Sequence, residues 1–336
     1  MRLQAFSSMG SRFGAITTDG LLLGWDLGAG LPVVARALRF VPPSTGIVDA
    51  ADGIAALTRD GQLFLVDDGM KAATRMAVDQ PVTAFVLACA AEFSASCVVT
   101  AGALRCAPPC GDVERLKLED APRLSGVARI WAGGTSACAL LETGAVHCWG
   151  ENGAGQLATG AVKRSERPRA LPGLSGIVEV ALGHAHGCAR DRAGRVHCWG
   201  DTTRGQAGTG VACPPDAPLV CRHTQPHPKP VNGLPKVDFL NAAEDLSCAG
   251  TTDPPALYCW GDARRLGGAA STTARGKPLG LPLPDGLSPL GAAHAGAYAL
   301  GDDNRVYRWV STRQEFVAVV DLGPALDAER ATPARD

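Results

Sequence analysis

Short runs in which apolar and polar residues alternate recur along most of the chain, and glycine or proline separates one run from the next. Residues 127–132 and 177–182 are two such runs, and each is followed by a second run centred on a cysteine. Alternation with a period of two is typical of a strand with one buried face, and the intervening glycines and prolines indicate turns. The pattern therefore predicts an all-β protein built from many short strands.

The order of these runs repeats. Residues 127–160 and 177–210 share one register, and the matching positions are Cys138 and Cys188, Gly144 and Gly194, Cys148-Trp149-Gly150 and Cys198-Trp199-Gly200, and Gly155-Gln156 and Gly205-Gln206. Each copy holds an alternating run, a cysteine-centred strand, a glycine turn and a strand ending in Cys-Trp-Gly. About four strands therefore fit in one copy. An internal repeat of this length is typical of a solenoid, a propeller or an array.

Laid on this template, the chain divides into seven copies. Their approximate boundaries are 3–46, 47–80, 81–126, 127–176, 177–236, 237–288 and 289–336. Seven copies predict a seven-bladed β-propeller, with four short antiparallel strands per blade and a single domain over residues 1–336. A closed ring leaves no end blade exposed, so we expect the two ends of the chain to meet at the ring closure. An open β-helix is the alternative, but its repeats are much shorter.

The repeat resembles that of the regulator of chromosome condensation family. The residues that carry the resemblance are Ala132-Gly133 and Leu182-Gly183, Thr143-Gly144 and Ala193-Gly194, Val146-His-Cys-Trp-Gly150 and Val196-His-Cys-Trp-Gly200, and the Gly-Gln pairs. The resemblance implies a seven-bladed propeller. It implies no single function, because such propellers include nucleotide-exchange factors, secreted inhibitors and bacterial surface proteins.

The cysteines flank the predicted turns. Antiparallel pairing about Thr143 sets Cys138 opposite Cys148, at the Cβ separation of about 4.5–5.5 Å of a cross-strand pair, which suits a disulfide. The same arithmetic predicts four cross-strand disulfides: Cys97–Cys106, Cys138–Cys148, Cys188–Cys198 and Cys248–Cys259. The alternatives are buried thiols that pack as small apolar groups, and a zinc site, although no Cys-x-x-Cys occurs.

Four further cysteines complete a total of 12. We expect Cys213 and Cys221 to staple an insertion in the fifth copy, and Cys89 and Cys110 to be the remaining pair. An even number of paired cysteines is typical of an oxidising environment. The first residues contain no apolar stretch of signal-peptide length, so the hypothesis is a secreted, periplasmic or cell-surface protein whose leader is absent from this sequence. The composition, rich in Ala and Arg, favours a bacterial source.

The formal net charge of -1 argues against a nucleic-acid partner. The sequence contains no run of 18 apolar residues, the length needed to span a membrane. No cofactor and no metal are predicted, and we expect a monomer. No Gly-x-Ser-x-Gly, phosphate loop or His-Glu-x-x-His motif occurs.

Candidate binding residues lie in the loop before each cysteine strand, where the copies carry different polar residues although the surrounding strand pattern is the same. They are Arg12, Thr135, Ser136, His184, His186, Glu244, Asp245 and His294, with His223 and His227 near the insertion. Polar positions that vary on a rigid scaffold are typical of a binding face. Solvated turn residues without a function would produce the same pattern.

Trp131 is a further candidate, and it and the pair His184 and His186 carry open alternatives. Trp131 stands in a column that otherwise holds Ala181, Asn241 and Gly291, so it is either an interface anchor or the filler of a gap between blades. His184 and His186 alternate along one predicted strand face and, with His294 or His223, would be a weak metal site.

The predicted function is a non-catalytic scaffold that binds another protein or a surface macromolecule through one ring face and the insertion at 211–230. Two alternatives remain open. One is a guanine-nucleotide exchange factor for a small GTPase, which the family resemblance suggests and the paired cysteines oppose. The other is an enzyme with its site at the mouth of the central channel.

Overall fold

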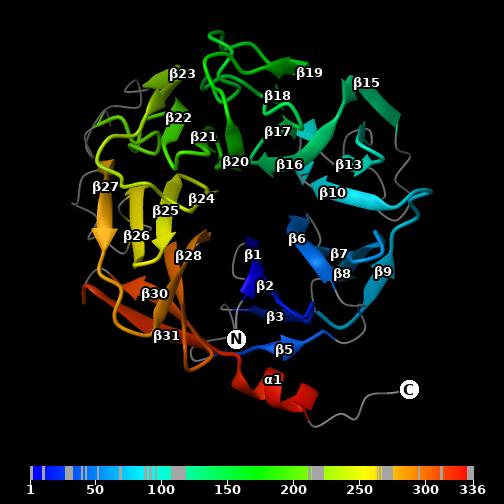
Figure 1. The fold of residues 1–336 in the computed structure, drawn as a ribbon, viewed down its shortest axis with the longest axis vertical. Coiled ribbons are helices and arrows are strands. Elements are labelled where there is room, and N and C mark those ends of the chain that lie inside the picture. Colours follow the sequence, from blue (N-terminus) through cyan, green and yellow to red (C-terminus); the bar gives the residue numbers. More distant parts are fainter. Residues whose placement is uncertain are drawn as a thin grey trace.

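The structure is a computed structural model of the chain. It describes residues 3–9, 12–26, 33–38, 41, 44–50, 53–67, 70–86, 89–90, 93–94, 97–106, 119–210, 213, 223–262, 264, 266, 275–293, 296–310 and 313–330. Seven sheets stand around a common centre, and the first strand of each sheet is nearest to that centre (Figure 1). The predicted seven-bladed β-propeller is confirmed.

Sheets 1 to 7 are numbered in chain order, and consecutive strands pair antiparallel within each. Sheet 1 holds β1 (Leu3–Met9), β2 (Arg12–Thr17), β3 (Leu22–Asp26) and β5 (Arg36–Ala37). Sheet 2 holds β6 (Ser44–Ala50), β7 (Gly53–Thr58), β8 (Leu63–Asp67) and β9 (Ala73–Arg75). Sheet 3 holds β10 (Val82–Val86), β13 (Cys97–Thr100), β14 (Ala103–Cys106) and β15 (Glu119–Ser125), and a small hairpin of β11 (Cys89–Ala90) and β12 (Phe93–Ser94) precedes β13.

The template copies form sheets 4 and 5. Sheet 4 holds β16 (Val127–Gly133), β17 (Ser136–Leu141), β18 (Val146–Gly150) and β19 (Ser165–Ala170). Sheet 5 holds β20 (Ile177–Leu182), β21 (His186–Asp191), β22 (Val196–Asp201) and β23 (Thr224–Pro230). Sheet 6 holds β24 (Phe239–Ala243), β25 (Leu246–Thr252), β26 (Pro255–Gly261) and β27 (Arg275–Leu281). Sheet 7 holds β28 (Leu287–Ala293), β29 (Gly296–Gly301), β30 (Arg305–Val310) and β31 (Glu315–Asp321).

The ring closes between sheets 7 and 1. A segment of the first copy, β4 (Val33–Val34), pairs with β31 as a fifth strand of sheet 7, and this pairing is parallel. The expectation of purely antiparallel, four-stranded blades is therefore wrong at the closure. The helix α1 (Gly323–Arg330) follows β31 and lies beside β5 (Figure 1). Phe13 of sheet 1 and Tyr298 of sheet 7 share one buried cluster, so the first and last blades pack together at the closure, whereas residues 1–2 and 331–336 lie outside the described residues.

The core is divided into clusters that lie between neighbouring blades. Each tryptophan of the repeat is buried against the preceding sheet, and these residues are Trp25, Trp149, Trp199, Trp260 and Trp309. A tryptophan at this position buries a large apolar area between two sheets that could not cover their own faces. Stacking of blades, rather than one central core, therefore holds the ring together.

The four predicted cross-strand disulfides all form. In each pair the two cysteines face one another on adjacent strands with Cα atoms 4.0–4.1 Å apart, and the pairs are Cys97–Cys106, Cys138–Cys148, Cys188–Cys198 and Cys248–Cys259. The buried-thiol and zinc alternatives are therefore wrong for these eight residues.

The other four cysteines are only partly accounted for. Cys213 is disulfide-bonded. Cys110 and Cys221 lie outside the described residues, and so does the side chain of Cys89. The predicted pairings of these four remain predictions.

Candidate binding face

One end of the ring is formed by the turns between first and second strands together with the loops between third and fourth strands. We call this end the loop face. A repeated hydrogen bond joins each turn to its own loop at 2.9 Å: Glu151 N to Thr135 O in sheet 4, Asp201 N to Ala185 O in sheet 5, and Asp262 N to Asp245 O in sheet 6. The opposite end, formed by the turns between second and third strands, is called the turn face. The loop face therefore has the same backbone framework in three consecutive blades.

Adjacent turns also touch one another across the blades. The amide of His184 donates to the carbonyl of Glu244 at 2.8 Å, which links sheets 5 and 6. A Cβ atom on Gly134 would lie 2.1 Å from the carbonyl oxygen of His184, so only glycine permits this approach between sheets 4 and 5. The loop face is thus a closely packed, preformed surface.

The structure separates the predicted loop residues into accessible and buried groups. His184 is exposed, and Thr135, Glu244 and Asp245 are half-buried. Ser136 is buried, and its hydroxyl is 3.4 Å from the carbonyl of Gly133, so the expectation that it offers a surface contact is wrong. The side chain of Arg12 and all of His294 lie outside the described residues.

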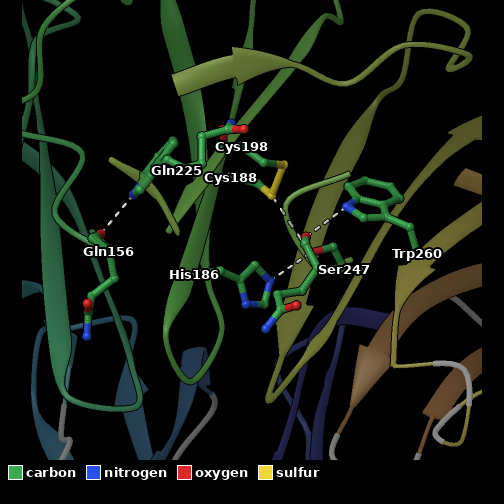
Figure 2. Close-up of a disulfide and its surroundings, with 9 residues drawn as sticks. Gln156, His186, Cys188, Cys198, Gln225, Ser247 and Trp260 are labelled. Carbon is green, nitrogen blue, oxygen red and sulfur yellow. Dashed lines mark hydrogen bonds between the residues drawn. A yellow bond between two sulfur atoms is a disulfide. The ribbon is translucent and has the colours of Figure 1, made fainter. Parts of the chain in front are cut away.

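His186 is also buried, and it belongs to a polar network between sheets 5 and 6 (Figure 2). Its Nε2 lies 2.7 Å from Ser247 Oγ, and Ser247 donates its only hydroxyl proton to the carbonyl of Gln206 at 3.1 Å. Ser247 must therefore accept from His186, so the Nε2 carries the proton and Nδ1 is bare. The carbonyl of Gln206 also accepts from Trp260 Nε1 at 2.9 Å, which closes the network.

Burial fixes the charge of this histidine. Desolvation, followed by the nearby His184, lowers the pKa of His186 to about 3, so the ring is neutral at neutral pH. The Nδ1 atom has no hydrogen-bond partner within the described residues. Because His184 is exposed and His186 is fully buried, the two rings do not form the exposed pair that the strand alternation suggested. Within the described ranges no group of three potential metal-ligating side chains occurs.

Trp131 lies on the innermost strand of sheet 4, directly opposite Cys138. It is half-buried and packs against the apolar cluster between sheets 4 and 5. The same register position holds Ala181 in sheet 5 and Asn241 in sheet 6, as the sequence alignment predicted. Asn241 instead accepts a hydrogen bond from the amide of Ala292 in sheet 7, at 3.0 Å. The contacts of Trp131 favour a packing role between blades.

The two histidines near the insertion lie towards the outside of sheet 5. His223 is exposed, and its carbonyl accepts from Thr202 N at 2.9 Å. His227 is exposed on β23 and lies against Gly160 of sheet 4. They are not brought together with His184 into one site by any described contact.

A charged cluster between sheets 5 and 6 was not predicted. Arg204 contacts both Asp245, with Nε–Oδ2 at 3.1 Å, and Asp262, with Nη1–Oδ2 at 3.4 Å. Arg264 forms a second ion pair with Asp262 at 2.7 Å. Burial would raise the pKa of Asp262, but hydrogen bonds and charge from Arg264, with the charge of Arg204, outweigh it and lower the pKa. The carboxylate is therefore ionised at neutral pH.

A signal for this cluster is present in the sequence. Arg204 occupies the position of Ala154 in the preceding copy, two residues before the glutamine of the Gly-Gln pair. Comparison of the copies at the loops between third and fourth strands, and not only at the turns, would have identified it. The cluster lies on the loop face, where Arg204 and Arg264 keep 42% and 55% of their side-chain surface exposed.

Glu179, on the innermost strand of sheet 5, is a further ionisable group with a shifted pKa. Burial raises the pKa of Glu179, although Arg190 opposes this shift with a hydrogen bond and its charge. The carboxylate accepts from Arg190 Nε at 2.8 Å and from the amide of Leu240 in sheet 6 at 3.1 Å. The contact with Leu240 joins sheets 5 and 6, so Glu179 stabilises the packing of these two blades.

Membrane crossing by a helix has no candidate in the described part of the chain, where α1 is the sole helix and has 8 residues.

Comparison with known proteins supports the repeat assignment. The Regulator of chromosome condensation (RCC1) repeat matches residues 143–190, and a second form of the same repeat matches residues 127–156 and 177–206. No curated protein matches the chain in sequence.

Several solved structures share the fold. Yeast RCC1 (Prp20) bound to Kap60 has a TM-score of 0.69 and 14% identity, over 90% of this chain and 81% of that chain. Prp20p from Saccharomyces cerevisiae, in a second structure, has a TM-score of 0.69 and 14% identity, over 98% and 85%. Human WBSCR16 has a TM-score of 0.55 and 19% identity, over 85% and 73%. At these identities the likeness is one of fold. Together, the matched repeats and the ring of seven sheets show that the chain carries RCC1 repeats within residues 127–206 and folds as a seven-bladed β-propeller.

Proposed function

We propose that this propeller binds another protein through the loop face of sheets 4 to 6, without chemistry of its own, outside a reducing compartment. The observation that carries the proposal is the contrast on that face. The backbone bonds between turn and loop are the same in all three blades, whereas the turn residues differ. The residue whose carbonyl accepts the bond is Thr135, Ala185 or Asp245, and the residue before it is Gly134, His184 or Glu244. Variation on a fixed framework is how a binding surface acquires specificity.

The accessible groups on this face suit a polar protein partner. His184 is exposed, and the neighbouring cluster of Arg204, Asp245, Asp262 and Arg264 presents charges of both signs. The hydrogen bonds His184 N–Glu244 O and Asp262 N–Asp245 O fix the backbone here, and the Cys248–Cys259 disulfide joins the strands next to Asp245 and Asp262. Little conformational entropy is therefore lost when a partner binds. The insertion at 211–230 is proposed to add contacts beside this surface.

The four disulfides support the proposed setting, which is secreted, periplasmic or at a cell surface. Disulfides persist in oxidising compartments and are rare in reducing ones. Among the proteins of similar fold, Prp20 binds Kap60, and its binding to Gsp1p and histones is described. Protein binding is therefore a use of this fold, although a nucleotide-exchange role would place these disulfides in a reducing compartment.

The setting is tested by intact mass after thiol alkylation, with and without reductant, on protein isolated from its native compartment. We expect the eight cysteines of the four described pairs to resist alkylation until they are reduced. Free thiols at these positions in freshly isolated protein would contradict the setting and would make small GTPases the first partners to examine.

The binding face is tested with two matched variants. The first replaces the exposed loop-face residues Arg164, His184 and Arg264 by alanine. The second replaces the exposed turn-face residues Glu142, Arg192 and Asp302. We expect a partner captured and cross-linked by the wild-type protein to be lost with the first variant and kept with the second. Equal capture by all three proteins would reject the loop face as the binding surface.

We further propose that residues 1–336 form one domain that acts as a monomer. Sedimentation at micromolar concentration is expected to give a single species of the mass of one chain, 34.6 kDa. A stable dimer would contradict this and would direct attention to a self-association surface.

A further inference from the structure

The outermost strands of sheets 4, 5 and 6 share a short motif in which a basic residue precedes a proline, and in sheets 4 and 5 a second basic residue follows it. The motif reads Arg167-Pro168-Arg169 in β19, His227-Pro228-Lys229 in β23 and Lys277-Pro278-Leu279 in β27. The strand pairing places the three copies in one register, because Arg169, Lys229 and Leu279 each lie opposite the second cysteine of the blade. A basic residue therefore recurs before the proline on the outer strands of all three blades, and a second recurs after it in sheets 4 and 5.

The fold explains the prolines of this motif. Each outer strand has a register shift beside the Cys-Trp-Gly segment, and each is the last strand of its sheet. Proline lacks the N–H that a ladder requires, so it is tolerated at such an irregular edge. Charged side chains on an edge strand also deter pairing with another chain, but charge of either sign does this, so the shared positive sign is left to be explained. Arg167, Lys229 and Lys277 are exposed and form no ion pair with the described part of the chain.

The local charge is strongly uneven. We define the basic rim as Arg167, Arg169, Lys229 and Lys277, all of which are exposed on the outer strands. In the three outer strands, residues 165–170, 224–230 and 275–281, the only acidic residue is Glu166. The whole chain has a formal net charge of -1, so the rim is a local excess of positive charge and not a general property. Such a concentration attracts anions.

The geometry and composition of the rim favour one class of partner. Outer strands diverge around the ring, so the cations of three blades are spread along its wall (Figure 1). This arrangement suits an extended chain with repeated anionic groups. Exposed Phe, Tyr and Trp side chains, on which nucleic-acid bases stack, do not occur among the side chains that the structure describes, where Val162 is the one exposed large apolar residue. We propose that the basic rim binds an anionic polysaccharide.

This inference uses a surface other than the loop face, and it relies on the proposed function only for the setting outside a reducing compartment. The probe is heparin, a sulfated uronate polymer, titrated against the full disulfide-bonded chain. We expect binding that weakens as salt rises, because exposed charges are screened. In the variant R167A/R169A/K229A/K277A the affinity should fall at least about tenfold, since four exposed ion pairs of modest strength are lost.

The matched control removes four exposed cations from other parts of the ring: K71A/R75A/R192A/R313A. It changes the net charge equally and should keep the wild-type affinity for heparin. Equal weakening by both variants would show general charge attraction and would overturn the site, and so would a lack of heparin binding by the wild-type protein. Tighter binding of duplex DNA or of phosphatidylserine vesicles would overturn the polysaccharide assignment. Loss of a protein partner in the loop-face variant with heparin binding intact separates the two proposals.

Discussion

The contacts between sheets 4 and 5 and between sheets 5 and 6 are built on the same framework but completed differently. In both, a tryptophan indole donates to the carbonyl of the preceding blade's glutamine: Trp199 to Gln156 at 2.8 Å and Trp260 to Gln206 at 2.9 Å. Around this shared bond, the first contact is filled by large apolar side chains, and the second by small ones and polar groups.

The residues at equivalent positions show the exchange. The 4/5 contact contains Leu157, Leu182 and the half-buried Trp131. The corresponding positions of the 5/6 contact hold Ala207, Ala242 and Ala181. The buried His186–Ser247 pair occurs at positions that hold Ser136 and Gly187 in the 4/5 contact. The same repeat can therefore fill the space between two blades in two ways, with large apolar side chains or with small side chains and a hydrogen-bonded polar network.

The largest effect is expected from removing apolar volume at the 4/5 contact. Leu157→Ala should lower the free energy of unfolding by about 2–5 kcal/mol, because the residue is fully buried. The reverse exchange, Ala207→Leu at the 5/6 contact, should cost about 1–3 kcal/mol through overpacking. Denaturant unfolding measures both. A neutral Leu157→Ala would show that the apolar cluster does not hold these blades together.

Breaking the polar network should destabilise only the 5/6 contact. Ser247→Ala leaves the buried Nε2–H of His186 without its acceptor, at about 1–3 kcal/mol. Ser136→Ala is the control at the 4/5 contact, where the hydroxyl makes only a 3.4 Å contact, and it should have a much smaller effect. Equal losses of unfolding free energy in the two variants would contradict the distinction.

Lowering the pH should destabilise the 5/6 contact more than the 4/5 contact, because the 5/6 contact contains the buried His186. Its pKa is lowered from 6.5 to about 3 in the folded state, so the unfolded chain takes up the proton first as the pH falls. The stability contributed by the neutral ring is present above pH 6.5 and is lost down to about pH 3, by up to about 1.4 kcal/mol per pH unit. Unfolding free energies at several pH values should show a shallower acid loss in His186→Gln than in the wild type. Parallel pH profiles would exclude this role.

The smallest effect concerns the shared indole bond. Trp199→Phe removes the one described donor to the carbonyl of Gln156, whereas after Trp260→Phe the carbonyl of Gln206 keeps Ser247. Both variants lose similar volume, so the difference between them should be about 1 kcal/mol, with the larger loss at the 4/5 contact. Thermal or denaturant unfolding of the pair tests this. A larger loss for Trp260→Phe would show that the two carbonyls do not differ as the network implies.

The structure of a single blade could be predicted from the local sequence pattern. Alternating runs, turn glycines and paired cysteines act within one copy, where the partners are about ten residues apart, so period and local pairing are readable from one chain. The repeat number, the register of four disulfides and the structural role of the tryptophans all follow from that local pattern.

Which side chains meet between neighbouring blades could not be read from the local pattern and follows from the packing of the sheets. His186 and Ser247 are 61 residues apart, and Glu179 and Leu240 are equally distant. Whether a polar residue before the cysteine strand points to solvent, like His184, or into the next blade, like His186, depends on the neighbouring sheet and not on strand alternation. The parallel strand β4 is a similar case, because two valines pair only when ring closure brings β31 beside them. Local periodicity encodes each sheet, whereas packing between sheets selects which polar groups remain available for binding.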